Sequence, residues 1–201
     1  MIKVNFELNG KSRTESVDPI KRLSEFLRDD MGLTATKVGC NAGDCGSCTV
    51  MIDGKTACSC LVSASQINGS KIETLENMAR DGQLSRLQRS FLHFGAAQCG
   101  ICTPGMLISA KALLDKQLEP SQKEVEDALG GVLCRCTGYK KIIEAVVHAH
   151  EFADEEILPE AGKGVGAAIR HLDGLPKVDG TLKYGADTIP ENALYVRVIR
   201  S

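Results

Sequence analysis

The chain has 201 residues, of which 43% are hydrophobic, and this is enough to bury the core of one or two domains. Its 24 basic and 26 acidic residues give a formal net charge of −2, which provides no long-range field toward nucleic acid or an anionic membrane. The sequence contains no run of eighteen or more apolar residues, and its first residues lack the apolar core of a signal peptide. We therefore expect a cytoplasmic protein with no membrane span and no nucleic-acid partner.

The first part of the chain has the period-two alternation of β-strands. Residues 3–8 alternate polar and apolar side chains, Asn9-Gly10 is a hairpin turn, and residues 12–17 continue the extended pattern. Asp18-Pro19 is typical of a helix start, and apolar residues from Ile20 onward recur at helical spacing. A hairpin with one packed helix is therefore expected.

Further strands are predicted at residues 49–52, after the Asp53-Gly54 turn as far as Cys60, and at 72–75. Two hairpins, one helix and an intervening loop predict an α+β domain at residues 1–76. Beyond residue 80 the apolar period changes to 3.6, which predicts four helices in a bundle at 77–152. Their apolar stripes begin at Leu84, Met106, Val125 and Ile142, and Ser121 with Glu124 forms a capping box for the third.

The last part of the chain differs from both domains. Residues 153–166 contain proline and several glycines, which is typical of a linker. Residues 167–201 include a candidate strand at 194–199 but too few apolar residues to bury a core of their own. We expect an extended tail that packs onto something larger.

The nine cysteines are not expected to form structural disulfides, because the cytosol keeps thiols reduced and their number is odd. Their clustering instead points to metal binding. A C-x4-C-x2-C run followed by a fourth cysteine is the spacing of plant-type ferredoxins, where four thiolates hold a [2Fe-2S] cluster. Gly43 and Gly46 lie within this loop, where a sharp turn must bring backbone N–H groups close to sulfur. The four predicted ligands are Cys40, Cys45, Cys48 and Cys60.

A second cysteine set follows in the helical half, as a C-x2-C pair and a C-x-C pair. Thr103-Pro104 and Thr137 are candidate helix starts beside these pairs, so two positive helix N-termini would face an anionic centre. Taken alone, this set fits a structural zinc site as well as an iron–sulfur cluster. The ferredoxin loop favours a second [2Fe-2S] cluster, because two redox centres make an electron path. The set consists of Cys99, Cys102, Cys134 and Cys136.

These motifs together resemble the iron–sulfur portion of the xanthine oxidase family of molybdenum hydroxylases. The resemblance covers residues 1–152 and includes the motifs Q-C-G-x-C-T-P-G and C-R-C-T-G-Y around the second set. It implies a β-grasp [2Fe-2S] domain followed by a four-helix-bundle [2Fe-2S] domain. It also implies that the first set holds the cluster distal to molybdenum and the second set the proximal one.

The resemblance further implies an electron-transfer subunit, with substrate hydroxylated at molybdenum in a partner chain and electrons leaving to FAD or another acceptor. Gln98 and Cys136 would contact the pterin of the molybdenum cofactor. The implied partners are a molybdenum-binding large subunit and an FAD-binding medium subunit, arranged as a higher-order dimer of heteromers. No catalytic residue is expected in this chain, and the substrate class is left open.

Residues 176–187 resemble the opening of the family's molybdenum-binding polypeptide, so we expect residues 167–201 to complete the fold of a separately encoded molybdenum subunit. Two alternatives remain: a free soluble ferredoxin with a helical extension, and a zinc-bearing scaffold protein. Cys58 is interpreted as a small buried hydrophobe, because Cys60 occupies the ligand position.

Overall fold

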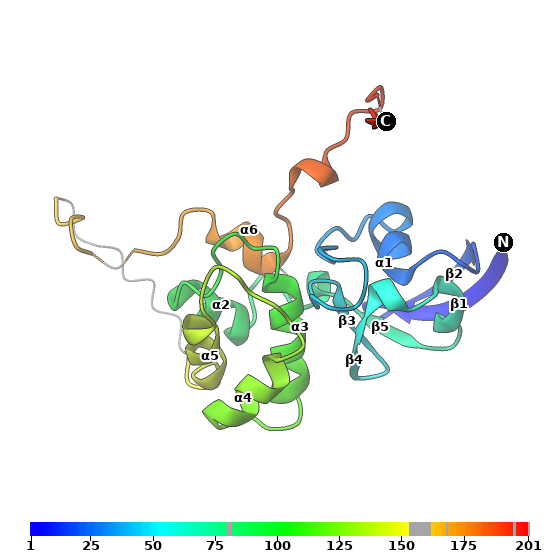
Figure 1. Ribbon diagram of the computed structural model, residues 1–201. Helices are drawn as coiled ribbons and strands as arrows, with labels where there is room; N and C mark the ends of the chain where they lie inside the picture. The colour runs from blue at the N-terminus through cyan, green and yellow to red at the C-terminus, as the bar shows by residue number, and fades with distance from the viewer. Residues whose placement is uncertain (80–81, 153–161, 168, 195, 201) are drawn as a thin grey trace.

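The computed structural model describes residues 1–79, 82–152, 162–167, 169–194 and 196–200 (Figure 1). A mixed five-stranded sheet forms the first half of the chain, and helices form the second. No helix within the described ranges has the length and apolar character needed to cross a bilayer. The predicted combination of sheet and helices is confirmed, whereas the domain limits at residues 76 and 152 stay predictions.

The sheet has the strand order β2-β1-β5-β3-β4. Strand β5 pairs in parallel with β1 and antiparallel with β3, so it joins the two hairpins into one sheet. The predicted final strand at 72–75 is shifted, because residues from Leu75 onward turn into a 3₁₀ helix. The strands span Ile2–Leu8 (β1), Lys11–Val17 (β2), Thr49–Ile52 (β3), Lys55–Cys58 (β4) and Lys71–Glu73 (β5).

The helix packed on the sheet is shorter than predicted. It comprises α1, Leu23–Glu25, and a π-helical turn at Phe26–Asp30. Asp18 does not cap it, because its carboxylate accepts a hydrogen bond from the Ile20 N–H at 3.1 Å. Ile20, predicted to belong to the buried face, is consequently 85% exposed.

Four helices in the second half agree with the four predicted stripes. The predicted capping box of Ser121 and Glu124 is present, and Ser85 with Gln88 forms a second one that was not predicted. Two predicted caps are wrong: α3 has Cys102 at its N-cap, and α5 follows Tyr139 instead of Thr137. The helices are Arg86–His93 (α2), Thr103–Leu114 (α3), Gln122–Leu129 (α4) and Lys140–Val147 (α5).

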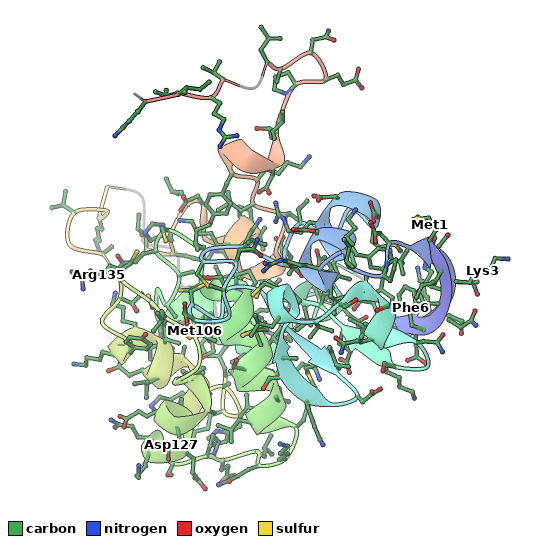
Figure 2. All side chains as sticks on the ribbon, turned by 45° about the vertical axis from the view of Figure 1, so that its right-hand side comes forward. Met1, Lys3, Phe6, Met106, Asp127 and Arg135 are labelled. Atoms are coloured by element: carbon green, nitrogen blue, oxygen red, sulfur yellow. The ribbon has the colours of Figure 1, made fainter. Side chains whose placement is uncertain are left out.

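Two apolar cores stabilise the molecule. The smaller one lies between the sheet and α1, where the Phe6 and Phe26 rings meet edge to face with centroids 5.9 Å apart. The larger one surrounds α3, and it also includes Met51 of the sheet. Figure 2 shows Met106 of α3 among the helices and Phe6 in the sheet half. Because α3 contacts both halves, it holds the two cysteine-bearing regions together.

The tail departs most from the sequence-based expectation. Residues 174–179 form a short helix, α6, which packs against α2 and α3 of this same chain. Residues 194 and 196–200 form no strand, and their apolar side chains are exposed, with Leu194 at 91% and Ile199 at 91%. Residues 153–161 of the predicted linker at 153–166 lie outside the described residues.

Candidate metal centres

The first cysteine set lies in an irregular loop before β3 and in the 3₁₀ turn that follows β4. Gly43 and Gly46 adopt φ angles of +84° and +68°, which side chains rarely tolerate. This backbone directs the N–H groups of Ala42 and Cys45 at the Cys40 sulfur, each at an N···S distance of 3.3 Å. Donors aimed at sulfur stabilise the thiolate form that a metal requires.

The two ends of this set differ in their surroundings. Hydrogen bonds from the Ala42 and Cys45 N–H groups lower the pKa of exposed Cys40 to about 7. Burial, followed by the neighbouring Cys48 thiol, raises the pKa of Cys60 to about 11. The set therefore reaches from the protein surface into the interior, and a thiolate at Cys60 needs a cation beside it.

Side chains outside the motif hold the loop against the Cys60 segment. The Arg22 guanidinium donates to the carbonyl oxygens of Asn41 at 2.6 Å and Cys60 at 3.0 Å. The Ser59 hydroxyl donates to the Cys48 carbonyl oxygen at 2.7 Å. The motif pattern itself did not identify these supporting residues, because they act through backbone atoms.

The second set lies where α3 and α5 begin. Buried Cys102 immediately precedes α3, and its burial raises the pKa of the thiol. The Tyr139 hydroxyl accepts a hydrogen bond from the Cys134 N–H at 2.9 Å and donates to the Val132 carbonyl oxygen at 3.2 Å. Thr137 Oγ1 lies 3.1 Å from Cys134 Sγ. Tyr139, the last residue of the C-R-C-T-G-Y motif, therefore shapes the Cys134 turn.

The thiols of each set are arranged in two neighbouring pairs. Cys40 borders Cys45 and Cys48 borders Cys60, with Cys58 also beside Cys48, while in the second set Cys99 borders Cys136 and Cys102 borders Cys134. Such pairs suit a [2Fe-2S] cluster, in which two ligands bind each iron. All nine cysteines are free thiols. The donor chemistry and the pairing fit two such clusters.

The two sets meet at the junction between the sheet half and the helical half. The Leu133 N–H donates to the Cys45 carbonyl oxygen at 2.9 Å, one residue before Cys134. A Cβ atom on Gly46 would come within 2.1 Å of the Gly131 carbonyl oxygen, so glycine permits this approach. One hydrogen bond thus connects Cys45 of the first set to Leu133, the residue before Cys134 of the second set.

The remaining candidate residues lie at the surface. Gln98, Cys99 and Cys136 are exposed, and the latter two are neighbours. Cys58 is half-buried at the end of β4, and its thiol donates to the Gly43 carbonyl oxygen at an S···O distance of 3.7 Å. Cys60 lies beyond the strand in the 3₁₀ turn, so the strand predicted to reach Cys60 ends at Cys58 instead.

Two families of [2Fe-2S]-binding domains match the chain. The "2Fe-2S iron-sulfur cluster binding domain" family matches residues 6–85, and the "[2Fe-2S] binding domain" family matches residues 74–147. The first matched region contains the first cysteine set, and the second region contains the second set. The two regions overlap at residues 74–85, which contain no cysteine.

Relatives resemble the chain over different lengths. The nicotinate dehydrogenase small FeS subunit of Eubacterium barkeri is 51% identical over 150 residues, covering 75% of this chain and 96% of that protein. The xanthine dehydrogenase iron-sulfur-binding subunit of Escherichia coli O157:H7 is 41% identical over 148 residues, covering 73% of this chain and 92% of that protein. The structure of an aldehyde oxidoreductase from Desulfovibrio desulfuricans ATCC 27774 matches 96% of this chain, with a TM-score of 0.89 and 37% identity.

The match to aldehyde oxidoreductase includes the tail, although this chain covers only 23% of that longer polypeptide. The two subunit relatives, one named as a small FeS subunit and the other as an iron-sulfur-binding subunit, match about three quarters of the chain. Because these subunits are covered almost completely at 51% and 41% identity, the chain belongs to the iron–sulfur subunits of the xanthine oxidase family of molybdenum-containing oxidoreductases.

Proposed function

We propose that this chain is the electron-transfer subunit of a molybdenum hydroxylase, with a β-grasp [2Fe-2S] domain followed by a four-helix-bundle [2Fe-2S] domain. When bound, the two clusters supply one-electron transfer between the molybdenum cofactor of a partner chain and FAD or another acceptor. The ligands are the four cysteines of each set. Gln98 and Cys136 form the surface that meets the pterin, which their exposure permits.

The observation that carries this proposal is the Leu133 N–H to Cys45 carbonyl hydrogen bond of 2.9 Å. It holds the two sets against each other, while exposed Cys40 of one set and exposed Cys99 of the other reach the surface. A chain with this arrangement can accept electrons at one surface and release them at another. Its residues contribute ligand positions, hydrogen bonds to sulfur and exclusion of solvent, which set reduction potentials.

We further propose a molybdenum-binding large subunit and an FAD-binding medium subunit as partners, in a cytoplasmic dimer of heteromers. The apolar side chains after residue 188 support a partner surface, because Ile189, Leu194, Val196 and Ile199 are 57–91% exposed. The segment at 174–187 packs on this chain, so residues 188–201 are the part proposed to contact the molybdenum subunit.

Purification from the native host, followed by metal analysis and electron paramagnetic resonance, tests the function. The expected result is co-elution with a molybdenum-containing chain and two distinct [2Fe-2S] signals after reduction. A preparation that elutes alone with a single signal would instead indicate a soluble ferredoxin. A colourless protein containing zinc would indicate the scaffold alternative.

Deleting residues 188–201 tests the proposed partner surface. Co-purification with the large subunit should fall, while both cluster signals of the small chain remain. Assembly at full strength without these residues would contradict the assignment.

A further inference from the structure

The segment Asp173–Asp187 lies across both halves of the chain. On the helical side, the buried Gln88 amide donates to the Val178 carbonyl oxygen at 2.9 Å, and neither side chain is exposed to solvent. On the other side, a Cβ on Gly180 would come within 2.5 Å of the Ala35 Cβ. The segment is therefore packed tightly against residues that precede the first cysteine loop and against α2.

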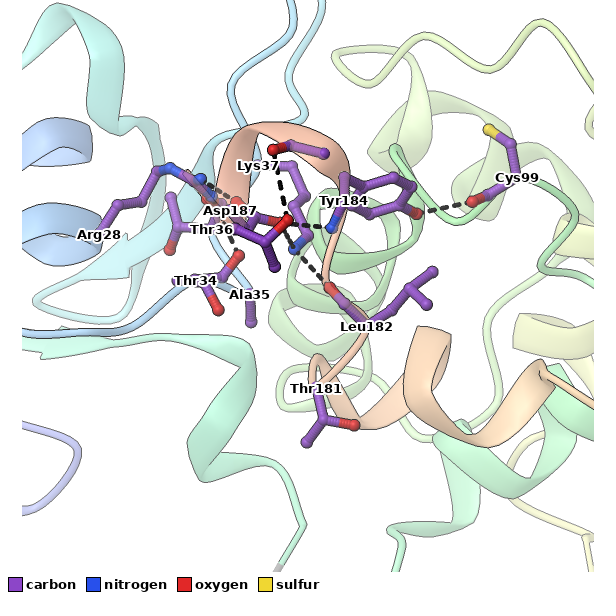
Figure 3. A network of polar contacts seen from close by, with 12 residues as sticks. Arg28, Thr34, Ala35, Thr36, Lys37, Cys99, Thr181, Leu182, Tyr184 and Asp187 are labelled. Atoms are coloured by element: carbon purple, nitrogen blue, oxygen red, sulfur yellow. Dashed lines mark hydrogen bonds and ion pairs between the residues drawn. The ribbon is translucent and has the colours of Figure 1, made fainter. Parts of the chain in front are cut away.

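Asp187 forms the strongest polar anchor of this segment (Figure 3). Its carboxylate pairs with the Arg28 guanidinium and lies 3.3 Å from the Lys37 ammonium. The side chains of Asp187 and Lys37 are only 2% and 4% exposed. Lys37 also donates to the Leu182 carbonyl oxygen at 2.9 Å. Because unpaired buried charges are strongly unfavourable, Lys37 and Arg28 hold Asp187 in place.

Tyr184 reaches from the same segment to the second cysteine set. Its hydroxyl donates to the Cys99 carbonyl oxygen at 2.6 Å, as Figure 3 shows. Gly100 has φ +91°, and a Cβ there would come within 2.5 Å of the Tyr184 hydroxyl oxygen and 2.8 Å of Lys177 Cγ. The outer side of the Cys99–Gly100 turn is thus covered by the segment.

The Lys37 ammonium also lies 4.9 Å from the centroid of the Tyr184 ring. The Tyr184 N–H donates to the Asp187 carboxylate at 2.8 Å, which links the two anchors within one short turn. Displacement of Asp187 from Arg28 and Lys37 would therefore move Tyr184 as well. A single turn connects the first half of the chain to a cysteine of the second set.

We infer that Asp173–Asp187 is an intramolecular clamp, in which Asp187 fixes the segment to the first half and Tyr184 positions the Cys99–Gly100 turn. Tyr184 and Asp187 act as positioning residues, because they reach the second set only through the backbone of Cys99. This inference depends on the proposed function in so far as Cys99 is a cluster ligand. The consequence is that the tail tunes the second cluster without supplying a ligand.

The experiment uses the full chain in its native complex, with Tyr184→Phe and Asp187→Asn as variants. Tyr184→Phe keeps the ring and removes the hydroxyl, whereas Asp187→Asn removes the carboxylate charge. Thr14→Val and Glu119→Gln are the controls, because they remove an exposed hydroxyl hydrogen bond and an exposed charge outside the clamp, the cysteine sets and residues 188–201. Iron content, the resonance spectrum and potential of each cluster, and the rate of tail proteolysis are measured.

We expect Tyr184→Phe to shift the spectrum and potential of one cluster only, with iron content unchanged. We expect Asp187→Asn to speed cleavage within the tail by about tenfold or more, because local opening governs proteolysis. Both controls should match the wild type. If the wild type shows two signals, but neither variant alters them and the rate of tail cleavage is unchanged, the clamp is overturned. A wild type lacking two [2Fe-2S] signals would overturn the proposed function instead.

Discussion

The carbonyl oxygen of Cys45 accepts a hydrogen bond from the Leu133 N–H at 2.9 Å, although 88 residues separate them along the chain. The bond forms only because Gly46 brings its backbone against Gly131 and Gly105. A Cβ on Gly105 would lie 2.4 Å from the Gly46 carbonyl oxygen. Small residues on both sides of the junction thus determine how closely the two cysteine sets approach.

Gly46→Ala is therefore expected to separate the two halves. The new methyl would overlap the Gly131 carbonyl oxygen, and alanine would also be strained at φ +68°. We expect a cost of about 2–5 kcal/mol, from overpacking together with left-handed backbone strain. The measurement is the urea concentration at which the visible absorbance of the clusters is lost.

Gly54→Ala is the matched control for this change. Gly54 has φ +75° in the turn between β3 and β4, but no atom lies within 4 Å of its added Cβ. Only the backbone strain of about 1–2 kcal/mol is expected there. Equal losses in the two variants would contradict the close approach as the cause.

The parts of the fold that depend on local sequence were predictable. The hairpin at residues 3–17 and the capping box of Ser121 and Glu124 are set by residues within a few positions of each other. The cysteine spacings likewise indicated two metal-binding sets. Ile20 was assigned wrongly, because the Asp18 side chain stabilises a local turn in place of the helix start.

The clamp was not predictable from local patterns. Helix α6 has only six residues, including Pro176, and its Val178 carbonyl oxygen accepts a hydrogen bond from Gln88, which is ninety residues away along the chain. Asp187 is likewise paired with Arg28, which is 159 residues away. Such contacts depend on residues far away along the chain, so no periodicity in the tail records them.

Cys48→Ser tests the ligand assignment of the first set. Loss of this buried thiolate should remove the first cluster, which is about two iron atoms per chain, and leave the second cluster's resonance signal. Cys58→Ser is the control, because Cys58 is half-buried nearby and donates to the Gly43 carbonyl oxygen, a bond that serine preserves. Equal iron loss in both variants would contradict the assignment of Cys58 as a non-ligand.

Tyr139→Phe should weaken the second set without removing a sulfur ligand. The Cys134 N–H would lose its acceptor and the Val132 carbonyl oxygen its donor. An unsatisfied buried group costs about 1–3 kcal/mol, so thermal loss of the second cluster should begin at a lower temperature. The first cluster's resonance signal serves as the internal reference. An unchanged loss temperature would show that the hydroxyl does not support this turn.

The pKa of Asp187 predicts how the clamp responds to acid. Burial alone would raise this pKa, but the Tyr184 N–H and the cations of Arg28 and Lys37 outweigh it and hold the pKa below its usual range. A carboxyl group with a depressed pKa stabilises the folded state above its unfolded pKa, and this contribution is lost as the pH falls through the folded value. The clamp should therefore stay closed from pH 7 down to about pH 4 and open below it.

Hydrogen exchange of the amides in α6, corrected for intrinsic rates, measures this opening. Protection in the wild type should be constant down to about pH 4 and then fall, because an unperturbed Asp titrates near that value. In Asp187→Asn, the α6 amides should exchange rapidly at every pH. The amides of Met106–Ala110 in buried α3 report whether the helical half remains folded. If α6 loses protection only together with α3, the carboxylate of Asp187 does not control the tail.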